Sequence, residues 1–336
     1  MHVRAGLCQG KAEYESDIFG RKFSVNVNEE HKSTQLKINN FANPHMRAFH
    51  ASWFGFFTTF FSTFAAAPLA PTLMKPSTLG LTRPQIQQGN IAAVLANIFC
   101  RLLMGLVSDK LGPRKGLVFV LLLCTPAILG MLLVQGATGF IICRGVIGIG
   151  LASFVACQVW CSQMFAKNCV GAANATAGGW GNLGGGITTL TMGFIYRGFL
   201  SVTNGNEDWA WRLCFIVPFV LHVAAAILAL SGRDLPDGNY KDLEASGAKQ
   251  KSDSKVVIKV GFSNINAWIL TITYGLCFGV ELTVTNVASQ YFYEYHGFRR
   301  ASPRHQPHHR PAVCAAPRAP APVALRAPQL TPLTDL

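Results

Sequence analysis

The chain of 336 residues is half hydrophobic, only 13% of it is charged, and its formal net charge is +13. So few charges among so many apolar residues are typical of a membrane protein, and they argue against a soluble enzyme or a disordered chain. The Lys and Arg residues stand in short blocks between apolar runs, which favours membrane loops over nucleic-acid binding.

Seven apolar runs are each about long enough to cross a bilayer as a helix, which takes about 20 residues. The polar segment 1–48 before them has no apolar core of a signal peptide, so we expect a cytoplasmic N-terminal segment. The third run is short, and Pro68 and Pro71 interrupt the first. The runs cover residues 49–74, 88–107, 117–134, 140–165, 170–196, 213–231 and 267–292.

Basic residues in the loops predict the orientation, because cytoplasmic loops carry an excess of Lys and Arg. With a cytoplasmic N-terminus, 17 of the 29 basic residues fall on the cytoplasmic side and four on the other side. We therefore expect the amino terminus in the cytoplasm.

Two arginines fall inside the predicted helices. Arg101 precedes Asp109 by eight residues, so it is about 12 Å deep, whereas Arg144 is near the outer end of the fourth helix, where we expect it to snorkel and to be structural. A buried arginine is costly unless it is paired or faces a polar cavity. Arg101 therefore either pairs with Glu281, in the middle of the seventh helix, or faces an anion from solution.

The loop after the second helix contains Gly105, Asp109, Gly112 and Arg114. It resembles the G-x-x-x-D-x-x-G-x-R/K loop of the major facilitator superfamily, which latches neighbouring helices on the cytoplasmic side. Asp109 and Arg114 suit this role because they can pair with charges and with helix ends.

Residues 177–186 of the fifth run hold six glycines and one amide, Asn182. A soluble helix would lose about 1 kcal/mol per interior glycine relative to alanine, but in lipid the segment should stay helical and use the glycines for close approach. Two interpretations remain: a smooth pore wall around a small polar substrate, or helix packing without a ligand. The glycines are Gly178, Gly179, Gly181, Gly184, Gly185 and Gly186.

The sequence resembles the nitrate/nitrite porter family of the major facilitator superfamily, in particular its plant and algal high-affinity branch. The resemblance covers about residues 23–298. The matching segments are 44–50, 52–54, 64–68, 99–105, 177–186, 234–240 and 274–283.

Site roles follow from this resemblance. It implies that Arg101 holds nitrate, that Asn182 and Tyr274 lie beside the substrate, and that Phe154 is the aromatic that sandwiches the planar anion. Glu281 is either a proton-coupling residue or a structural partner of Arg101. The resemblance also implies proton-coupled uptake by alternating access in the plasma membrane, with a small single-span accessory protein as partner, and it implies no metal or cofactor.

The chain departs from this family after residue 298. The family has twelve helices and a second nitrate-binding arginine in the eighth, whereas residues 299–336 hold eight of the 17 prolines, six arginines and no spanning run. We expect a shifted reading frame or a retained intron here, with a genuine disordered tail as the alternative.

The expected architecture is an all-α, multi-pass membrane protein that contains an amino-terminal six-helix bundle and a seventh helix, with the second half missing. We divide it into residues 1–48, the bundle 49–231, a mobile cytoplasmic loop 232–262, the seventh helix 263–298 and the tail 299–336. The first functional hypothesis is an incomplete nitrate or nitrite transporter. The alternatives are a non-transporting half-carrier (an anion sensor, partner-binding subunit or inert product) and, more weakly, a carrier of another small anion.

Overall fold

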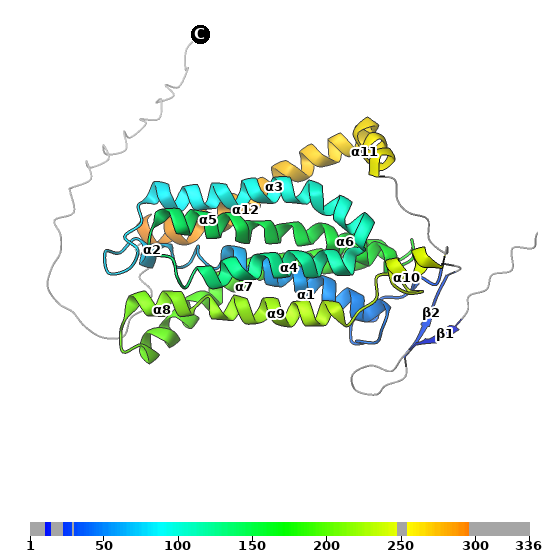
Figure 1. Cartoon of the computed structure of the whole chain (residues 1–336), viewed down its shortest axis with the longest axis horizontal. Helices are drawn as coiled ribbons and strands as arrows, with labels where there is room; N and C mark the ends of the chain where they lie inside the picture. The colour runs from blue at the N-terminus through cyan, green and yellow to red at the C-terminus, as the bar shows by residue number, and fades with distance from the viewer. Residues whose placement is uncertain (1–10, 15–22, 29, 247–253, 296–336) are drawn as a thin grey trace, which may run out of the picture. The chain divides into compact units, whose positions relative to one another are not determined.

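The computed structural model describes residues 11–14, 23–28, 30–246 and 254–295, so the tail 299–336 lies outside the described residues. Long helices that run side by side make up most of these residues (Figure 1). Two short antiparallel strands, β1 (Lys11–Tyr14) and β2 (Phe23–Asn26), pair with Lys11 opposite Asn26. The helices are α1 (His45–Phe64), α2 (Ala70–Leu73), α3 (Arg83–Leu111), α4 (Pro113–Gly130), α5 (Ala137–Gly148), the 3₁₀ turn η1 (Ile149–Ala152), α6 (Ser153–Met164), α7 (Val170–Val202), α8 (Glu207–Leu213), α9 (Ile216–Leu230), α10 (Tyr240–Ala245), α11 (Ser254–Ser263) and α12 (Ile265–Tyr295).

Five helical stretches of the described chain are long and apolar enough to cross a membrane. The first and fifth expected runs form α1 and α7, of 20 and 33 residues, which are richer in small and polar residues. The predicted all-α, multi-pass fold is confirmed. The five stretches are Arg83–Leu111, Pro113–Gly130, Ala137–Met164, Glu207–Leu230 and Ile265–Ala288.

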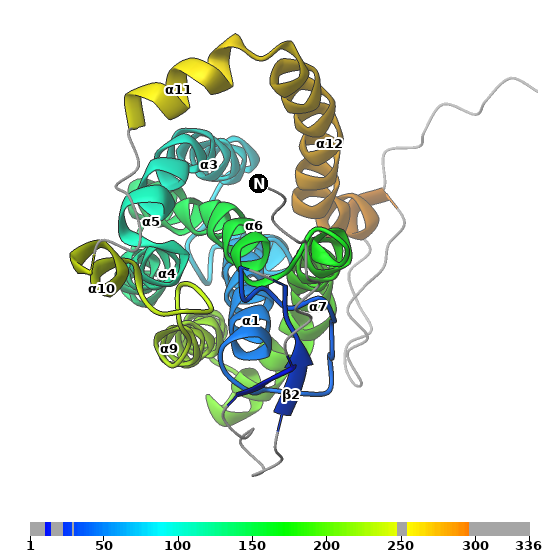
Figure 2. The ribbon, with the colours of Figure 1, turned by 90° about the vertical axis from the view of Figure 1, so that its right-hand side faces the viewer.

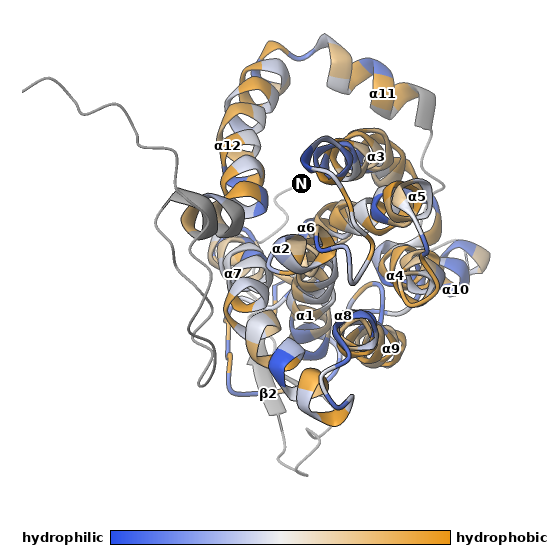
Figure 3. Cartoon of the chain, turned by 90° about the vertical axis from the view of Figure 1, so that its left-hand side faces the viewer, coloured by the Kyte–Doolittle hydropathy of each residue, from blue (hydrophilic) through white to orange (hydrophobic). Residues whose placement is uncertain are grey.

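Hydrophobic residues make up much of these helices, which Figure 3 colours orange by residue hydropathy. Phe119 of α4, Leu133 after α4 and Ile227 of α9 are more than half exposed. In water such a surface would drive aggregation, but it suits contact with lipid chains. The helices therefore turn apolar residues both inward and outward.

Helix α1 lies at the centre of the bundle and packs against α6, α7 and α9 (Figure 2). Its phenylalanines Phe56, Phe60 and Phe64 are buried. Glycines of α7 allow the approach, since a Cβ at Gly181 would overlap the ring of Phe56 and one at Gly184 would overlap the carbonyl oxygen of Phe57. The packing interpretation of the glycine-rich segment therefore holds for this face of α7.

The structure corrects three expectations about regular elements. The first run is not one helix, because α1 ends at Phe64 and the short α2 follows a turn that contains Pro68. The fourth run is interrupted by η1, where Gly148 lies against the backbone of Ala93. The loop 232–262, expected to be mobile, contains α10 and α11 and a fully buried carboxylate, Asp234.

Candidate functional site

Arg101 lies on α3, one turn after Asn97. In a helix, residues four apart share a face, and the Nε of Arg101 donates a hydrogen bond of 3.1 Å to the Oδ1 of Asn97. Asn97 is only 3% exposed. The side chain of Arg101 therefore leaves α3 in a fixed direction, toward the bundle.

Three aromatic rings surround the guanidinium group of Arg101. Its central carbon is 4.4 Å from the ring centre of Phe278, 5.2 Å from that of Phe154 and 5.7 Å from that of Tyr274. Tyr274 stacks on Phe154 and on Phe278 with ring centres 5.8 and 5.5 Å apart. A cation over aromatic faces is attracted by their negative quadrupole, so the rings stabilise the charge without neutralising it.

One donor group of Arg101 has no protein partner. The Nη1 donates to the hydroxyl of Tyr274 at 3.4 Å, but the Nη2 is buried without a hydrogen bond. A buried, unsatisfied donor on a charged group costs about 1–3 kcal/mol or more. No ion pair joins Arg101 to Glu281 among the described residues, so of the two predicted partners an anion from solution fits this geometry.

Asn182 lies on α7, half-buried, and its Oδ1 has no hydrogen-bond partner. No hydrogen bond joins it to Arg101 in the described structure. Gly178, one turn earlier on the same face of α7, lies against Phe154: a Cβ there would be 3.7 Å from the ring. This places Asn182 about one helical turn from the aromatic cluster.

Glu281 lies on α12, two turns after Tyr274, and is half-buried. Seven residues are close to two full turns, so Glu281 and Tyr274 share a face of α12. The predicted residues Arg101, Phe154 and Tyr274 thus meet, while Asn182 and Glu281 flank them.

Sequence reasoning missed Asn97 and Phe278 as parts of this site. Both stand four residues from a predicted site residue, Asn97 from Arg101 and Phe278 from Tyr274. That spacing is the signal that identifies them, because residues four apart on a helix face the same side.

The loop motif closes the end of the bundle that carries the α3–α4 turn. Arg114 donates through Nη1 to the carbonyl oxygens of Leu230 and Gly232, at 3.3 and 3.0 Å, and so caps the end of α9. Its backbone N–H donates to Asp234 Oδ1 at 3.1 Å. Burial raises the pKa of the Asp234 carboxyl, against the effect of Arg114, which lowers it.

The other three residues of this motif, Gly105, Asp109 and Gly112, differ in their surroundings. Gly112 has φ +86°, and a Cβ there would be 2.5 Å from Asp234 Oδ1, so both conformation and space require glycine. Nothing lies within 4 Å of a Cβ at Gly105. Asp109 is in the last turn of α3, where the helix dipole disfavours a negative charge. Of its two charged residues, Arg114 thus binds a helix end, and Asp109 makes no ion pair among the described residues.

Arg144 does not snorkel, contrary to expectation. It is 1% exposed and donates to the carbonyl oxygen of Thr63, to Asn90 Oδ1 at 2.7 Å and to Asn286 Oδ1 at 3.4 Å. These partners come from three different elements, so the charge is solvated by protein oxygens instead of by water. The interpretation of Arg144 as structural fits these bonds.

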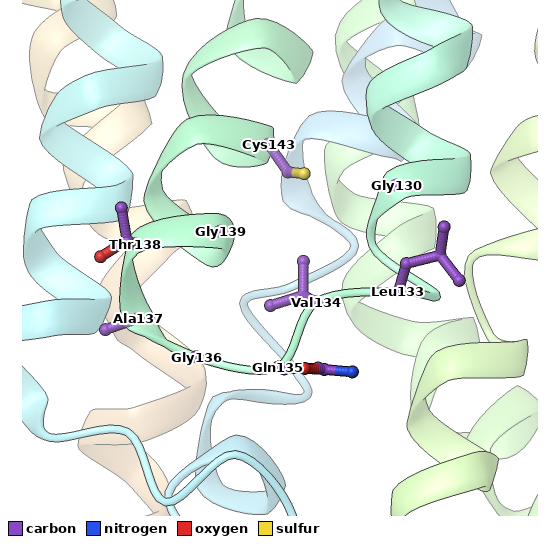
Figure 4. Close-up of a pocket in the computed structure, with 9 residues that line it drawn as sticks. All are labelled: Gly130, Leu133, Val134, Gln135, Gly136, Ala137, Thr138, Gly139 and Cys143. Carbon is purple, nitrogen blue, oxygen red and sulfur yellow. The ribbon is translucent and has the colours of Figure 1, made fainter.

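A shallow pocket opens at the turn between α4 and α5, and Figure 4 shows the residues that line it. Its lining is mostly glycine and apolar side chains, with Gln135, Thr138 and Cys143 as the polar members. None of the predicted site residues lines it, and it has no charged group that would hold an anion.

Comparison with known proteins places the chain in a family. Residues 52–306 match the family model described as Major Facilitator Superfamily. The chain is 42% identical over 274 residues to the high-affinity nitrate transporter 2.3 of Oryza sativa, which covers 81% of the chain and 52% of that relative. It is 40% identical to the high affinity nitrate transporter 2.5 of Arabidopsis thaliana (85% and 56%) and 41% identical to nitrate transporter 2.1 of Chlamydomonas reinhardtii (85% and 52%). The chain thus spans about half the length of these relatives.

Solved structures show the same fold at low sequence identity. A bacterial homologue of the human lysosomal transporter Spinster, in an inward-facing and unoccupied conformation, matches with a TM-score of 0.57 at 15% identity, covering 75% of this chain and 56% of that one. A D-xylose-proton symporter matches with a TM-score of 0.51 at 18% identity, covering 76% and 62%. The helical arrangement and the sequence matches agree: the chain belongs to the Major Facilitator Superfamily and, within it, to the plant and algal branch of the nitrate/nitrite porter family.

Proposed function

We propose that this chain carries the amino-terminal part of a nitrate transport site, centred on Arg101. The observation that carries the proposal is the unpaired Nη2 of Arg101 beside three stacked aromatic rings. A planar guanidinium suits a planar oxyanion through two parallel hydrogen bonds. The rings of Phe154 and Tyr274 supply flat faces against which a flat anion can lie.

Transport requires the anion to leave on the other side of the membrane. In alternating access, two halves of the carrier rock about a central site. In this proposal Asn182 donates its amide N–H to nitrate, and Glu281 takes up a proton as the coupling residue. The lack of an ion pair between Glu281 and Arg101 favours the coupling role over the structural one. Nitrite, with the same charge and a smaller oxyanion, fits the same groups.

The cellular setting is also a proposal. The bias of basic residues favours a cytoplasmic amino terminus, and the family supports a place in the plasma membrane and a small single-span accessory partner.

A second candidate function is a half-carrier that binds the anion and does not transport it. The observation that favours it is the Nη2 of Arg101, which is unpaired among the described residues and could hold an anion whether or not the helices around it move. Both candidates share the Arg101 site, so binding and transport must be measured separately.

The first prediction concerns Arg101. Arg101→Lys keeps the charge but loses the planar pair of donors, so nitrate binding to the 336-residue chain in lipid nanodiscs should weaken by about 1.5–3 kcal/mol, which is roughly 10- to 150-fold. Isothermal titration with nitrate measures this, and Arg197→Lys, at an exposed position of α7, is the matched control.

Uptake of labelled nitrate into cells without their own carriers then separates the two functions. Uptake by the 336-residue chain that depends on a proton gradient supports the transporter, and binding without uptake supports the half-carrier. Equal nitrate affinity in the wild type and in Arg101→Lys would remove Arg101 from the site.

A further inference from the structure

Helix α11 is joined to the membrane-spanning helix α12 by a single residue, Asn264. Because the apolar span of α12 begins at Ile265, the bilayer boundary at this end lies next to the end of α11. Figures 1 and 2 show α11 running across the direction of the long helices. This attachment and direction are those expected of a helix at a membrane surface.

A tryptophan fixes the end of α11 at that level. Trp268, in the first turn of α12, donates its ring N–H to the carbonyl oxygen of Phe262 at 2.9 Å. The two rings also meet edge to face, 5.6 Å apart. Tryptophan gathers at membrane–water interfaces because its ring is apolar and its N–H is polar. The bond therefore holds the last turn of α11 at the depth of the interface.

The exposed side chains of α11 are mainly apolar. Val256, Ile258, Val260 and Phe262 are between 44% and 63% exposed, so no described part of the chain covers them. On a helical wheel at about 100° per residue, the apolar positions 256, 257, 258, 260 and 262 span a broad arc. Position 259 lies in the remaining sector, together with position 255, which precedes it by four residues. An apolar face beside lysines is the pattern of helices that lie in the interface of anionic membranes.

We propose that α11 docks on the anionic lipid surface of the leaflet at the α3–α4 end of the bundle. Its apolar side chains enter the boundary between headgroups and acyl chains, and the sector of the helix that carries positions 255 and 259 meets the negative headgroups. The charge bias assigns this end to the cytoplasm, whose leaflet is the negatively charged one. This surface is independent of the Arg101 site, so it holds whether or not the chain transports nitrate.

The test compares hydrogen exchange of α11 in two kinds of nanodisc, one of neutral phosphatidylcholine and one that also contains anionic phosphatidylglycerol. Each lysine near an anionic surface favours the bound state by about fivefold. The amides of residues 256–263 should therefore exchange at least about tenfold more slowly in the anionic discs. Exchange in α3 serves as the internal reference, because it should not change with lipid charge.

Charge reversal separates docking from general electrostatics. Lys255→Glu/Lys259→Glu should abolish the difference between the two lipids, while Lys167→Glu/Lys241→Glu, which changes the net charge equally at exposed positions of the same end, should preserve it. Protection of α11 that is equal in both lipids and unchanged by Lys255→Glu/Lys259→Glu would overturn the proposal and indicate that protein covers the helix.

Discussion

Arg101 and Arg144 both bring a guanidinium group into the membrane-spanning bundle, but the protein satisfies them differently. Arg144 has oxygen acceptors from Thr63, Asn90 and Asn286 around it. Arg101 has one amide, one hydroxyl and three aromatic rings, which leave the Nη2 unpaired. The Nε of Arg144 is also buried without a hydrogen bond, so the two groups differ in their surroundings. Oxygen acceptors from three elements hold Arg144 in place, whereas Arg101 lies among aromatic rings that offer its outer donor no strong acceptor.

A second prediction concerns the effect of pH on stability, through Asp234. Burial raises the pKa of Asp234 in the folded chain above its unfolded value, in spite of Arg114. The folded state therefore binds this proton more tightly, so protonation stabilises the fold as the pH falls from neutral through the raised pKa. Above that pKa the ionised carboxylate lowers the free energy of unfolding. The loss is about 1.4 kcal/mol for each unit by which the folded pKa exceeds the unfolded pKa.

Asp234→Asn removes this contribution. Thermal unfolding in detergent from neutral to mildly acidic pH should show the wild type gaining stability relative to Asp234→Asn as the pH falls. Asp242→Asn, at an exposed position of α10, should follow the wild type. Parallel pH profiles for the wild type and Asp234→Asn would contradict the prediction.

At the scale of elements, the contact between α1 and α7 depends on where α7 lacks a side chain. Gly184 faces the backbone of α1, at the carbonyl oxygen of Phe57, while Gly186, two residues on, has nothing within 4 Å of a Cβ. The glycine-rich segment therefore has a packing face and a free face.

The prediction at this scale is a pair of alanine substitutions. Gly184→Ala forces the two helices apart and should destabilise the protein by about 1–3 kcal/mol, whereas Gly186→Ala should be neutral. Thermal stability of the purified protein, followed by size-exclusion chromatography, measures both. Equal stability of the two variants would mean that the α1–α7 contact does not depend on Gly184.

Much of the fold could be predicted from the sequence, and part of the site. Apolar runs, the loop motif and the glycines are local patterns, so each expected run corresponds to a long helix or an interrupted one. The break at η1 and the partners of Arg144 were not predictable, because they depend on contacts between distant segments: Asn286 is 142 residues away. Helix α11 was hidden among the charges of a segment that was expected to be mobile.

At the scale of the whole molecule, α12 is attached to the rest of the bundle at few places. Besides contacts with α2 and α7, it meets Arg101 and Phe154 through Tyr274, Arg144 through Asn286, and Phe60 through Phe278. Among the five apolar spans of the described chain, the one in α12 is the least buried.

The prediction for the whole molecule concerns this attachment. Asn286→Ala removes one acceptor of Arg144, and since one such bond is worth about 1 kcal/mol, hydrogen exchange in α12 should become about fivefold faster. Thr283→Ala is the control, because its hydroxyl donates to Gly279 within α12 itself. Identical exchange in the two variants would show that Arg144 does not hold α12.

The two arginine contacts of α12 also set how it responds to membrane thickness. Tyr274 and Asn286 are twelve residues apart, or about 18 Å along the helix axis, and each meets an arginine on a different helix. A helix usually adapts to a thinner bilayer by tilting or kinking. Tilting α12 about either contact would carry the other one away from its arginine, so in a thin membrane the lipid around α12 should deform while the helix keeps its position.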